Sequence, residues 1–178
     1  MKRLVKTTAL TLLLISPHLW AADADLDVRA EVSGDFLSIT PQQTLDFGAF
    51  TAPGSEVTIT VNTEGNRTPS VAPPNIFMLG AGSEGIVNIS GIADQPVTLS
   101  TNAPVDLENG AATIALNNIT FRAAGESSDS PNVTLPNADP GEFTSDIDVA
   151  IGGQITVPAN PAPGTYTGTL VVTVDYQL

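Results

Sequence analysis

The side chains that most often carry out enzymatic chemistry are scarce in this sequence. Among 178 residues there are nineteen Asp and Glu, but a single His, His18, and no Cys. Both lysines, Lys2 and Lys6, lie close to the N-terminus. A chain that loses this N-terminal segment keeps no His, Cys or Lys, so it can build neither a Ser-His-Asp or Cys-His nucleophile nor a Schiff-base lysine. Thiolate and imidazole metal sites are excluded for the same reason.

Carboxylates are the one reactive group in good supply, and two kinds of chemistry could use them. A carboxylate pair can hydrolyse a glycosidic bond, yet aromatic residues, which would mark out a sugar cleft, make up only 5% of the chain. The stretches DADLD at 23–27 and DID at 146–148 space carboxylates two apart, but a calcium loop counted from Asp23 needs Gly where Val28 stands. We interpret both stretches as solvated strand faces. The sequence thus predicts a protein that is not an enzyme and binds no metal or cofactor.

The first 22 residues have the layout of a secretory signal peptide. Three basic residues precede an apolar run from about residue 9 to residue 15, and small residues follow at Ala21 and Ala22. This run is shorter than the roughly 20 apolar residues that a membrane helix needs. We therefore expect an exported protein without direct membrane insertion, whose residues 23–178 form a single domain.

Loss of that segment would leave a strongly acidic chain. Three arginines, Arg29, Arg67 and Arg122, would stand against nineteen Asp and Glu, which gives a net charge of −16. Nucleic acid binding needs clustered Lys and Arg, and anionic membrane surfaces attract basic segments. Nucleic acid and anionic membranes are therefore not expected as partners.

Proline, glycine and short alternating runs indicate an all-β fold. Fourteen Pro and fifteen Gly interrupt the chain, and no segment keeps a helical period. Alternating or β-branched runs between turn-forming clusters predict strands at residues 26–32, 44–50, 56–62, 85–90, 96–101, 112–121, 145–157 and 164–178. Many short strands at such spacing favour an immunoglobulin-like antiparallel β-sandwich, with a closed barrel as the alternative.

Residues 22–34 alternate without a break between apolar and polar side chains. The odd positions are mostly charged, and the apolar even positions include Leu26, Val28, Ala30 and Val32. A strand of this kind can bury one face in a groove and keep the other face in water. The segment is either the first strand of its own sandwich or a donor strand for another subunit, and the sequence leaves both readings open.

The last residues show the same period. From Gly164 onward the even positions carry Gly, aromatic or aliphatic residues, among them Leu170, Val172, Val174 and Tyr176, and the odd positions are mostly polar. This pattern predicts a strand with one buried face. A strand at the edge of a sheet presents unpaired backbone groups that invite pairing with another chain. We therefore expect a partner strand beside it.

Together the two alternating segments resemble those of a pilin subunit of the bacterial chaperone–usher type. Gly164 and Tyr176 stand twelve residues apart, as a Gly and an aromatic residue do in the last strand of that family, although two residues follow Tyr176 where the family has one. The resemblance implies an incomplete sandwich whose C-terminal strand borders an open groove, filled by the N-terminal donor strand of the next subunit. It also implies partners: copies of this chain or related subunits, a periplasmic chaperone and an outer-membrane usher.

Two other stretches carry resemblances of their own. TLDFGAF at 44–50 resembles the LDFG strand of pilins related to spore-coat-like secreted proteins. GGQITVPANPAPGTYTGTLVVTVDYQ at 152–177 is similar to a widespread family of bacterial secreted proteins catalogued as a domain of unknown function. That second resemblance implies a β-sandwich and export.

Two hypotheses about function follow from the sequence. The first is a structural subunit of a bacterial surface fimbria or similar polymer, assembled by donor-strand complementation. The second is a self-contained secreted or periplasmic binding module, whose own residues 23–34 complete the sandwich.

Overall fold

The regular structure of the described residues consists of β-strands. The computed structural model describes residues 36–177, which belong to one compact unit. The expected signal peptide and the alternating segment 23–34 lie outside the described residues. The strands within them are β1 (Ser38–Gln43), β2 (Ala49–Phe50), β3 (Val57–Val61), β4 (Arg67–Pro69), β5 (Met78–Leu79), β6 (Gly85–Ile92), β7 (Pro96–Thr101), β8 (Val105–Asn109), β9 (Ala112–Ala123), β10 (Asn132–Thr134), β11 (Thr144–Val157) and β12 (Val172–Tyr176).

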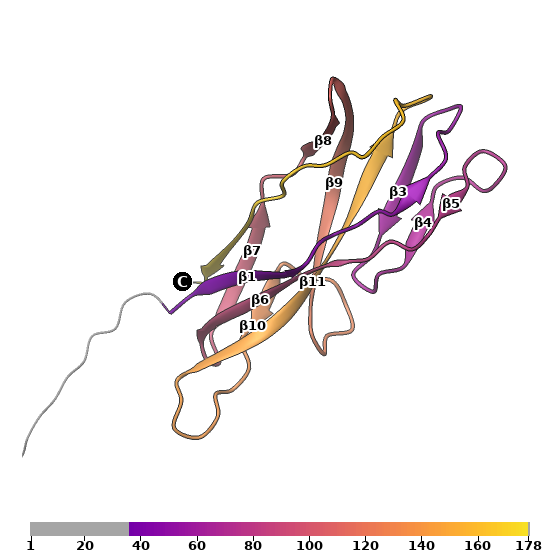
Figure 1. Ribbon diagram of the computed structural model, residues 1–178. Coiled ribbons are helices and arrows are strands. Elements are labelled where there is room, and N and C mark those ends of the chain that lie inside the picture. Colours follow the sequence, from indigo (N-terminus) through magenta and orange to yellow (C-terminus); the bar gives the residue numbers. More distant parts are fainter. Residues whose placement is uncertain (1–35, 178) are drawn as a thin grey trace, which may run out of the picture. The chain divides into compact units, whose positions relative to one another are not determined.

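The larger sheet is built around β11, the longest of these strands. Residues 144–151 of β11 pair with β6 and residues 153–157 pair with β3, while β9 pairs along residues 149–156. β1 extends the sheet beyond β6, β4 extends it beyond β3, and β8 extends it beyond β9. All of these pairings are antiparallel, and Figure 1 shows β11 running through the middle of the arrangement.

A bulge in β9 lets this strand bury side chains in two parts of the core. Its register with β11 shifts between Gly152 and Gln154, and Asn118 lies in the bulge with a φ of 49°. Asn is one of the few residues that adopts this left-handed conformation readily. The extra residue reverses the alternation of side chains, so the buried residues of β9 are even-numbered before the bulge and odd-numbered after it: Ile114, Leu116, Phe121 and Ala123.

A second layer completes a sandwich on each part of the core. The sheet β10-β7-β12 brings Val97 and Leu99 of β7 against Ile89 of β6 and Val149 of β11 in a first cluster. The ribbon β2-β5 and its neighbouring segments bring Phe47 and Ile76 to a second cluster, on the side of β3. The predicted all-β antiparallel sandwich is confirmed. The sheets do not close into a barrel, because β1 and β12 are both edge strands within residues 36–177.

Two strand predictions were too long, and the backbone shows why. Only Ala49–Phe50 of the 44–50 stretch is a strand, because Gly48 has a φ of 63° and its N–H donates to the carboxylate of Asp46 at 2.7 Å, which makes a turn. Only Val172–Tyr176 of the 164–178 stretch is a strand, preceded by an isolated bridge between Thr167 and Glu108.

The C-terminal segment nevertheless runs antiparallel first to β8 and then to β7. Thr167 exchanges two backbone hydrogen bonds with Glu108 of β8, of 2.8 and 3.1 Å. Asn102, between β8 and β7, donates its backbone N–H to Val171 at 3.3 Å. β12 then pairs with β7 from Val172–Thr101 to Tyr176–Val97. Because β8 belongs to one sheet and β7 to the other, the segment breaks its pairing where the chain changes sheets.

Candidate strand-acceptor groove

The outer edge of β12 offers backbone groups that no strand in residues 36–177 uses. Asn102 N–H bonds to Val171 O, and Gln177 N–H bonds to Pro96 O. In an antiparallel pair, successive residues turn their N–H and C=O groups to opposite edges. The odd residues of β12 therefore bond to β7, and the even residues Val172, Val174 and Tyr176 point theirs to the outer edge.

β1 is the edge strand of the other sheet and lies across from β12. It pairs with β6 on one side, in a register from Ser38–Ser90 to Gln43–Ile86. Figure 1 shows β1 and β12 next to each other, and the two strands are in contact. The structure therefore places two unpaired strand edges, one from each layer, on either side of the same gap. We call this gap the β1–β12 groove.

The groove is lined by apolar side chains that are only partly buried. Val97 and Leu99 of β7, in the interior of the small sheet, are 0% and 3% exposed. By contrast, the apolar residues beside the groove pack on the first cluster and stay in the intermediate range of exposure: Leu37, Ile39, Leu170, Val172, Val174 and Tyr176. A side chain that is covered from below and open from the side can gain further burial from one more strand.

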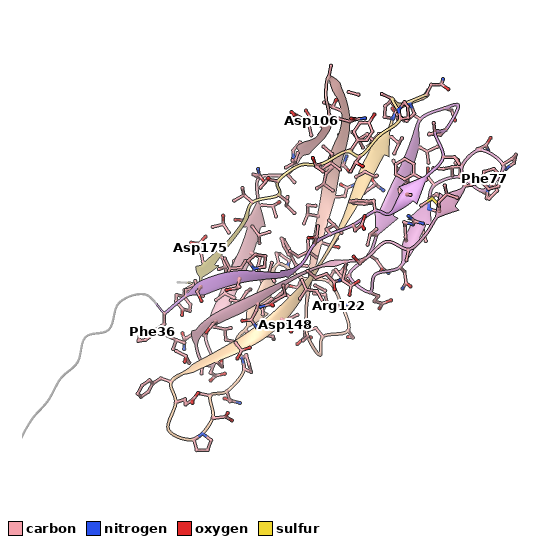
Figure 2. The ribbon with its side chains drawn as sticks, in the orientation of Figure 1. Phe36, Phe77, Asp106, Arg122, Asp148 and Asp175 are labelled. Carbon is pink, nitrogen blue, oxygen red and sulfur yellow. The ribbon has the colours of Figure 1, made fainter. Side chains whose placement is uncertain are left out.

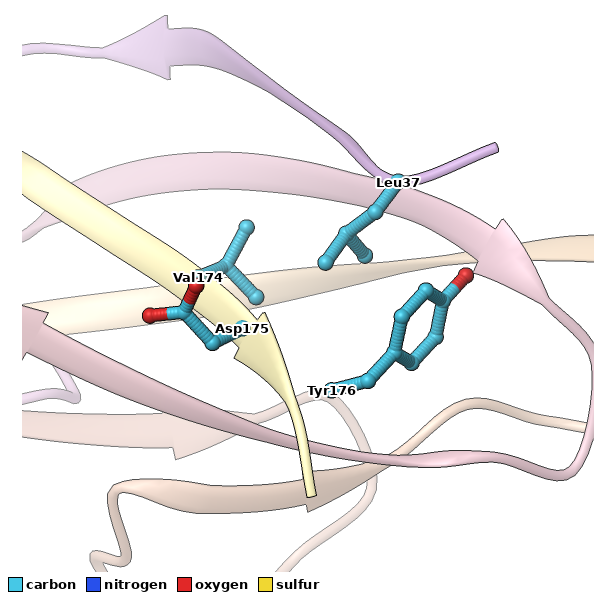
Figure 3. Close-up of a pocket in the computed structure, with 4 residues that line it drawn as sticks. All are labelled: Leu37, Val174, Asp175 and Tyr176. Atoms are coloured by element: carbon cyan, nitrogen blue, oxygen red, sulfur yellow. The ribbon is translucent and has the colours of Figure 1, made fainter. Parts of the chain in front are cut away.

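A cavity of about 270 Å³ marks the end of the groove near Tyr176. Leu37, Val174, Asp175 and Tyr176 line it. Figure 3 shows Leu37 of the β1 side facing Val174 and Tyr176 of β12 across this space. This volume would accept an aliphatic side chain of an inserted strand.

Tyr176 also connects the two layers. Its hydroxyl accepts a hydrogen bond from the backbone N–H of Ile92, at the end of β6, with a distance of 2.8 Å. The ring reaches that atom because Gly91 has no side chain: a Cβ at Gly91 would lie 2.8 Å from the Tyr176 hydroxyl and 3.0 Å from Leu37 Cδ1. Tyr176 thereby holds the end of β12 at a set distance from β6.

We expect Tyr176→Phe to destabilise the fold by about 1 kcal/mol, the usual net contribution of one hydrogen bond. The matched control is Tyr166→Phe, because the Tyr166 hydroxyl bonds only to the nearby Ala162 carbonyl at 2.8 Å. Urea titration of both variants measures the difference. A free energy of unfolding of Tyr176→Phe equal to that of the parent chain would show that the Tyr176 hydroxyl does not connect the layers.

The structure places the sequence-predicted residues as follows. Leu170, Val172, Val174 and Tyr176 all lie beside the groove, and Leu170 contacts both core clusters. Gly164 lies outside β12, with a φ of 146° and next to Asn109 of β8. The predicted donor residues Leu26, Val28, Ala30 and Val32 lie outside the described residues.

Sequence reasoning missed the β1 side of the groove. Leu37 and Ile39 alternate with polar residues, which is a weak strand signal, but the run ends in SITPQQ with Pro41 inside it. Proline cannot donate to a strand ladder, and it is tolerated in edge strands and at bulges. The register of β1 with β6 does shift between Pro41 and Gln43.

The carboxylates of the DID stretch lie on the outer face of the larger sheet. The side-chain amide of Asn88 donates to Asp146 and to Asp148, each at 2.9 Å. A second cavity, of about 330 Å³, is lined in part by Arg122, Glu126 and Asp148, and Arg122 is paired with Glu64 at 2.8 Å. Figure 2 shows Arg122 and Asp148 on this part of the sheet. Within residues 36–177, no three His, Cys, Asp or Glu side chains gather where a metal ion could bind.

Comparison with known proteins identifies the family. A model of the family described as a domain of unknown function, DUF4402, matches residues 37–176, from the first groove residue of the β1 side to the last residue of β12. The chain belongs to the DUF4402 family. No curated protein and no solved structure matches it. The DUF4402 match thus covers both sides of the groove and begins after the alternating segment 22–34. No helix in the part of the chain that the structure describes is long and apolar enough to cross a membrane.

Proposed function

We propose that this protein is a non-enzymatic structural subunit of a bacterial surface fimbria or similar polymer, assembled by donor-strand complementation. The observation that most supports this proposal is the β1–β12 groove, where two unpaired strand edges face each other over partly buried apolar side chains. Residues 23–34 of a neighbouring copy would fill this groove. Their unbroken alternation matches a site that is apolar below and open to water above.

The free energy gained by burying the apolar side chains of residues 23–34 supports their role as a donor strand. Leu26, Val28, Ala30 and Val32 would face the groove, and their burial is worth roughly 4–10 kcal/mol at about 1.5–3 kcal/mol for each larger side chain. Backbone hydrogen bonds to both edges would add to it once β1 and β12, parts of which lie within 8 Å of each other, move to the roughly 9.5 Å that a strand paired on both sides requires. The charged odd positions, including Asp25, Asp27 and Arg29, would remain in water. Exchange between copies would then be slow to reverse.

Before assembly, a subunit would expose the groove residues and two open strand edges. Such edges promote aggregation unless another chain covers them. We therefore propose that the exported subunit is held by a periplasmic chaperone and delivered by an outer-membrane usher, in keeping with the resemblance of its two alternating segments to those of pilins.

Sizing and electron microscopy of the chain without residues 1–22 test the proposal directly. We expect concentrated protein to form linear polymers, in which each subunit contributes one donor strand. Purified protein that stays monomeric at all concentrations, with no fibre in the micrographs, would contradict the proposal.

One observation favours the second candidate, a self-contained secreted binding module. Residues 36–177 already build two core clusters in which Ile59, Ile89 and Val97 are 0% exposed. A subunit with this much core could be completed by its own residues 23–34 and remain a monomer. In that case these residues should be protected from protease in the dilute monomer, whereas a free donor strand should be cleaved quickly.

A further inference from the structure

We infer that assembled copies also contact each other end to end, with the Phe36 end of one sandwich packed on the Phe77 end of the next. This inference rests on the proposed strand exchange and names a second contact between the same two copies. The occupant of both surfaces is a second copy of this chain. Figure 2 places Phe36 and Phe77 at opposite ends of the sandwich.

The first surface, the Phe36 patch, consists of Phe36, Ile92 and Phe143. Their exposed fractions are 40%, 40% and 79%, which makes them three of the most exposed large apolar residues in the described chain. Extending the β1–β6 register by two residues sets Phe36 opposite Ile92. Phe143 lies at the same end of the larger sheet, since Thr144 pairs with Ile92 and the Phe143 carbonyl accepts a hydrogen bond from Ala93 N–H at 3.0 Å.

The second surface, the Phe77 patch, consists of Phe77 and Leu79. They are 49% and 52% exposed, on either side of Met78, which packs on the second core cluster. Arg67 fixes the ribbon beneath them, since its guanidinium donates to the backbone carbonyls of Phe47, Ala49 and Gly80. This patch is therefore held in place by the fold and yet open to solvent.

The length of the chain brings one of these ends to the neighbouring copy. If Val32 of one copy lies in the groove of another, Phe36 of the same copy follows only four residues later. Four residues span at most about 14 Å. The Phe36 patch of the donor copy must therefore lie close to one end of the acceptor groove.

That end is either the Tyr176 end or the Leu170 end of the groove. Leu37 and Tyr176 line one cavity, so the Tyr176 end carries the acceptor's own Phe36 patch. At the other end of the groove, residues 44–48 connect β1 to β2, and β2 pairs with Met78–Leu79, so the Leu170 end leads to the Phe77 patch. The two choices correspond to contact between like ends and contact between unlike ends.

Charge favours the unlike ends. The turns around the Phe36 patch carry Asp94, Asp139 and Glu142, and Glu142 N–H bonds to Asp139 O at 3.0 Å. Contact between two Phe36 patches would bring these carboxylates against their own copies. The segment that carries the Phe77 patch has no charged residue from position 68 to position 83, and the Arg67 guanidinium that binds the Gly80 carbonyl beside it is positive. Apolar contact is therefore available there without repulsion, and repeated contacts between unlike ends give an open fibre.

Engineered cysteines test this polarity in a chain that has no cysteine of its own. Three forms of residues 23–178 are compared: Phe143→Cys, Leu79→Cys and the double variant. Each is assembled, treated with a short bis-maleimide linker and run on a denaturing gel. We expect a ladder of covalent multimers from the double variant alone. The control pair Phe143→Cys with Val171→Cys, where Val171 is 50% exposed but belongs to neither patch, should give no ladder.

Other outcomes would overturn the inference in distinguishable ways. Covalent dimers from Phe143→Cys alone would show that like ends meet. Polymers seen by sizing, without a ladder from the double variant, would leave strand exchange standing and reject the end contact. Monomers at all concentrations would reject the polymer and the contact together. As an independent measure, Phe77→Ser with Leu79→Ser should raise the protein concentration needed for assembly about tenfold or more, at an unchanged melting temperature.

Discussion

We expect a chain that carries both Leu26→Asp and Val28→Asp to fold as a normal monomer and no longer to join a polymer. This is the largest effect that we expect from any change. In the proposed assembly, both side chains enter an apolar groove of a neighbouring copy. An ionised carboxylate without a partner there costs several kcal/mol, which is comparable to the whole gain of roughly 4–10 kcal/mol from the donor side chains.

This change should leave the melting temperature of the monomer unchanged, because a donor strand contributes nothing to the core of its own subunit. The measurement is a thermal melt of the dilute monomer, followed by sizing at high concentration. Asp25→Asn with Asp27→Asn is the matched control, since it alters the same segment on the face turned to water. That control should keep both its melting temperature and its assembly. A drop of many degrees in the melt of the double Asp variant would instead show that the segment completes its own sandwich.

We expect Gly91→Val to destabilise the monomer by about 3 kcal/mol, at the upper end of the cost of overfilling a packed core. A Cβ at this position would lie 2.7 Å from Leu135 Cδ1, 2.8 Å from the Tyr176 hydroxyl and 3.0 Å from Leu37 Cδ1. Leu135 is 1% exposed and has no room to move outward. The new side chain must therefore push Leu37 or Tyr176 toward the groove.

The same substitution should weaken assembly as well, because it changes the width of the groove. Urea titration of the monomer gives the loss of stability, and sizing gives the loss of assembly. Gly54→Val is the control, because no heavy atom lies within 4 Å of a Cβ at Gly54. Similar free energies of unfolding for the two variants would mean that β6 and β12 can separate without cost at Gly91.

Much of the fold could be predicted from local pattern. Strands such as Val57–Val61 and Pro96–Thr101 have one buried face and one open face, and their side chains alternate accordingly. Period two in the sequence is a direct consequence of that geometry. The same holds for the even residues of β12, whose partial burial matches the alternation from Leu170 to Tyr176. The DUF4402 match is in accord with the resemblance of residues 152–177.

Other strands have only a weak local signature and depend on their partners. β1 contains Pro41 and β8 reads VDLEN between two turn clusters, yet each pairs with a regular neighbour, β6 and β9. An edge strand needs only one side of its backbone satisfied, and it packs few side chains. Its composition is therefore weakly constrained, and the sequence alone does not reveal it.

What the sequence alone determined was the all-β sandwich, the shortage of catalytic side chains and the alternation of the segments 22–34 and 164–178. What only the tertiary structure decided was that β1 and β12 face each other as edges of two different layers, and that Gly91 lets Tyr176 reach Ile92 between them. The alternation of apolar and polar residues shows which side chains of a strand face the other sheet and which face solvent. It carries no information about which strands face each other across a groove, because residues from distant parts of the chain meet there, such as Leu37 and Tyr176, which line one cavity.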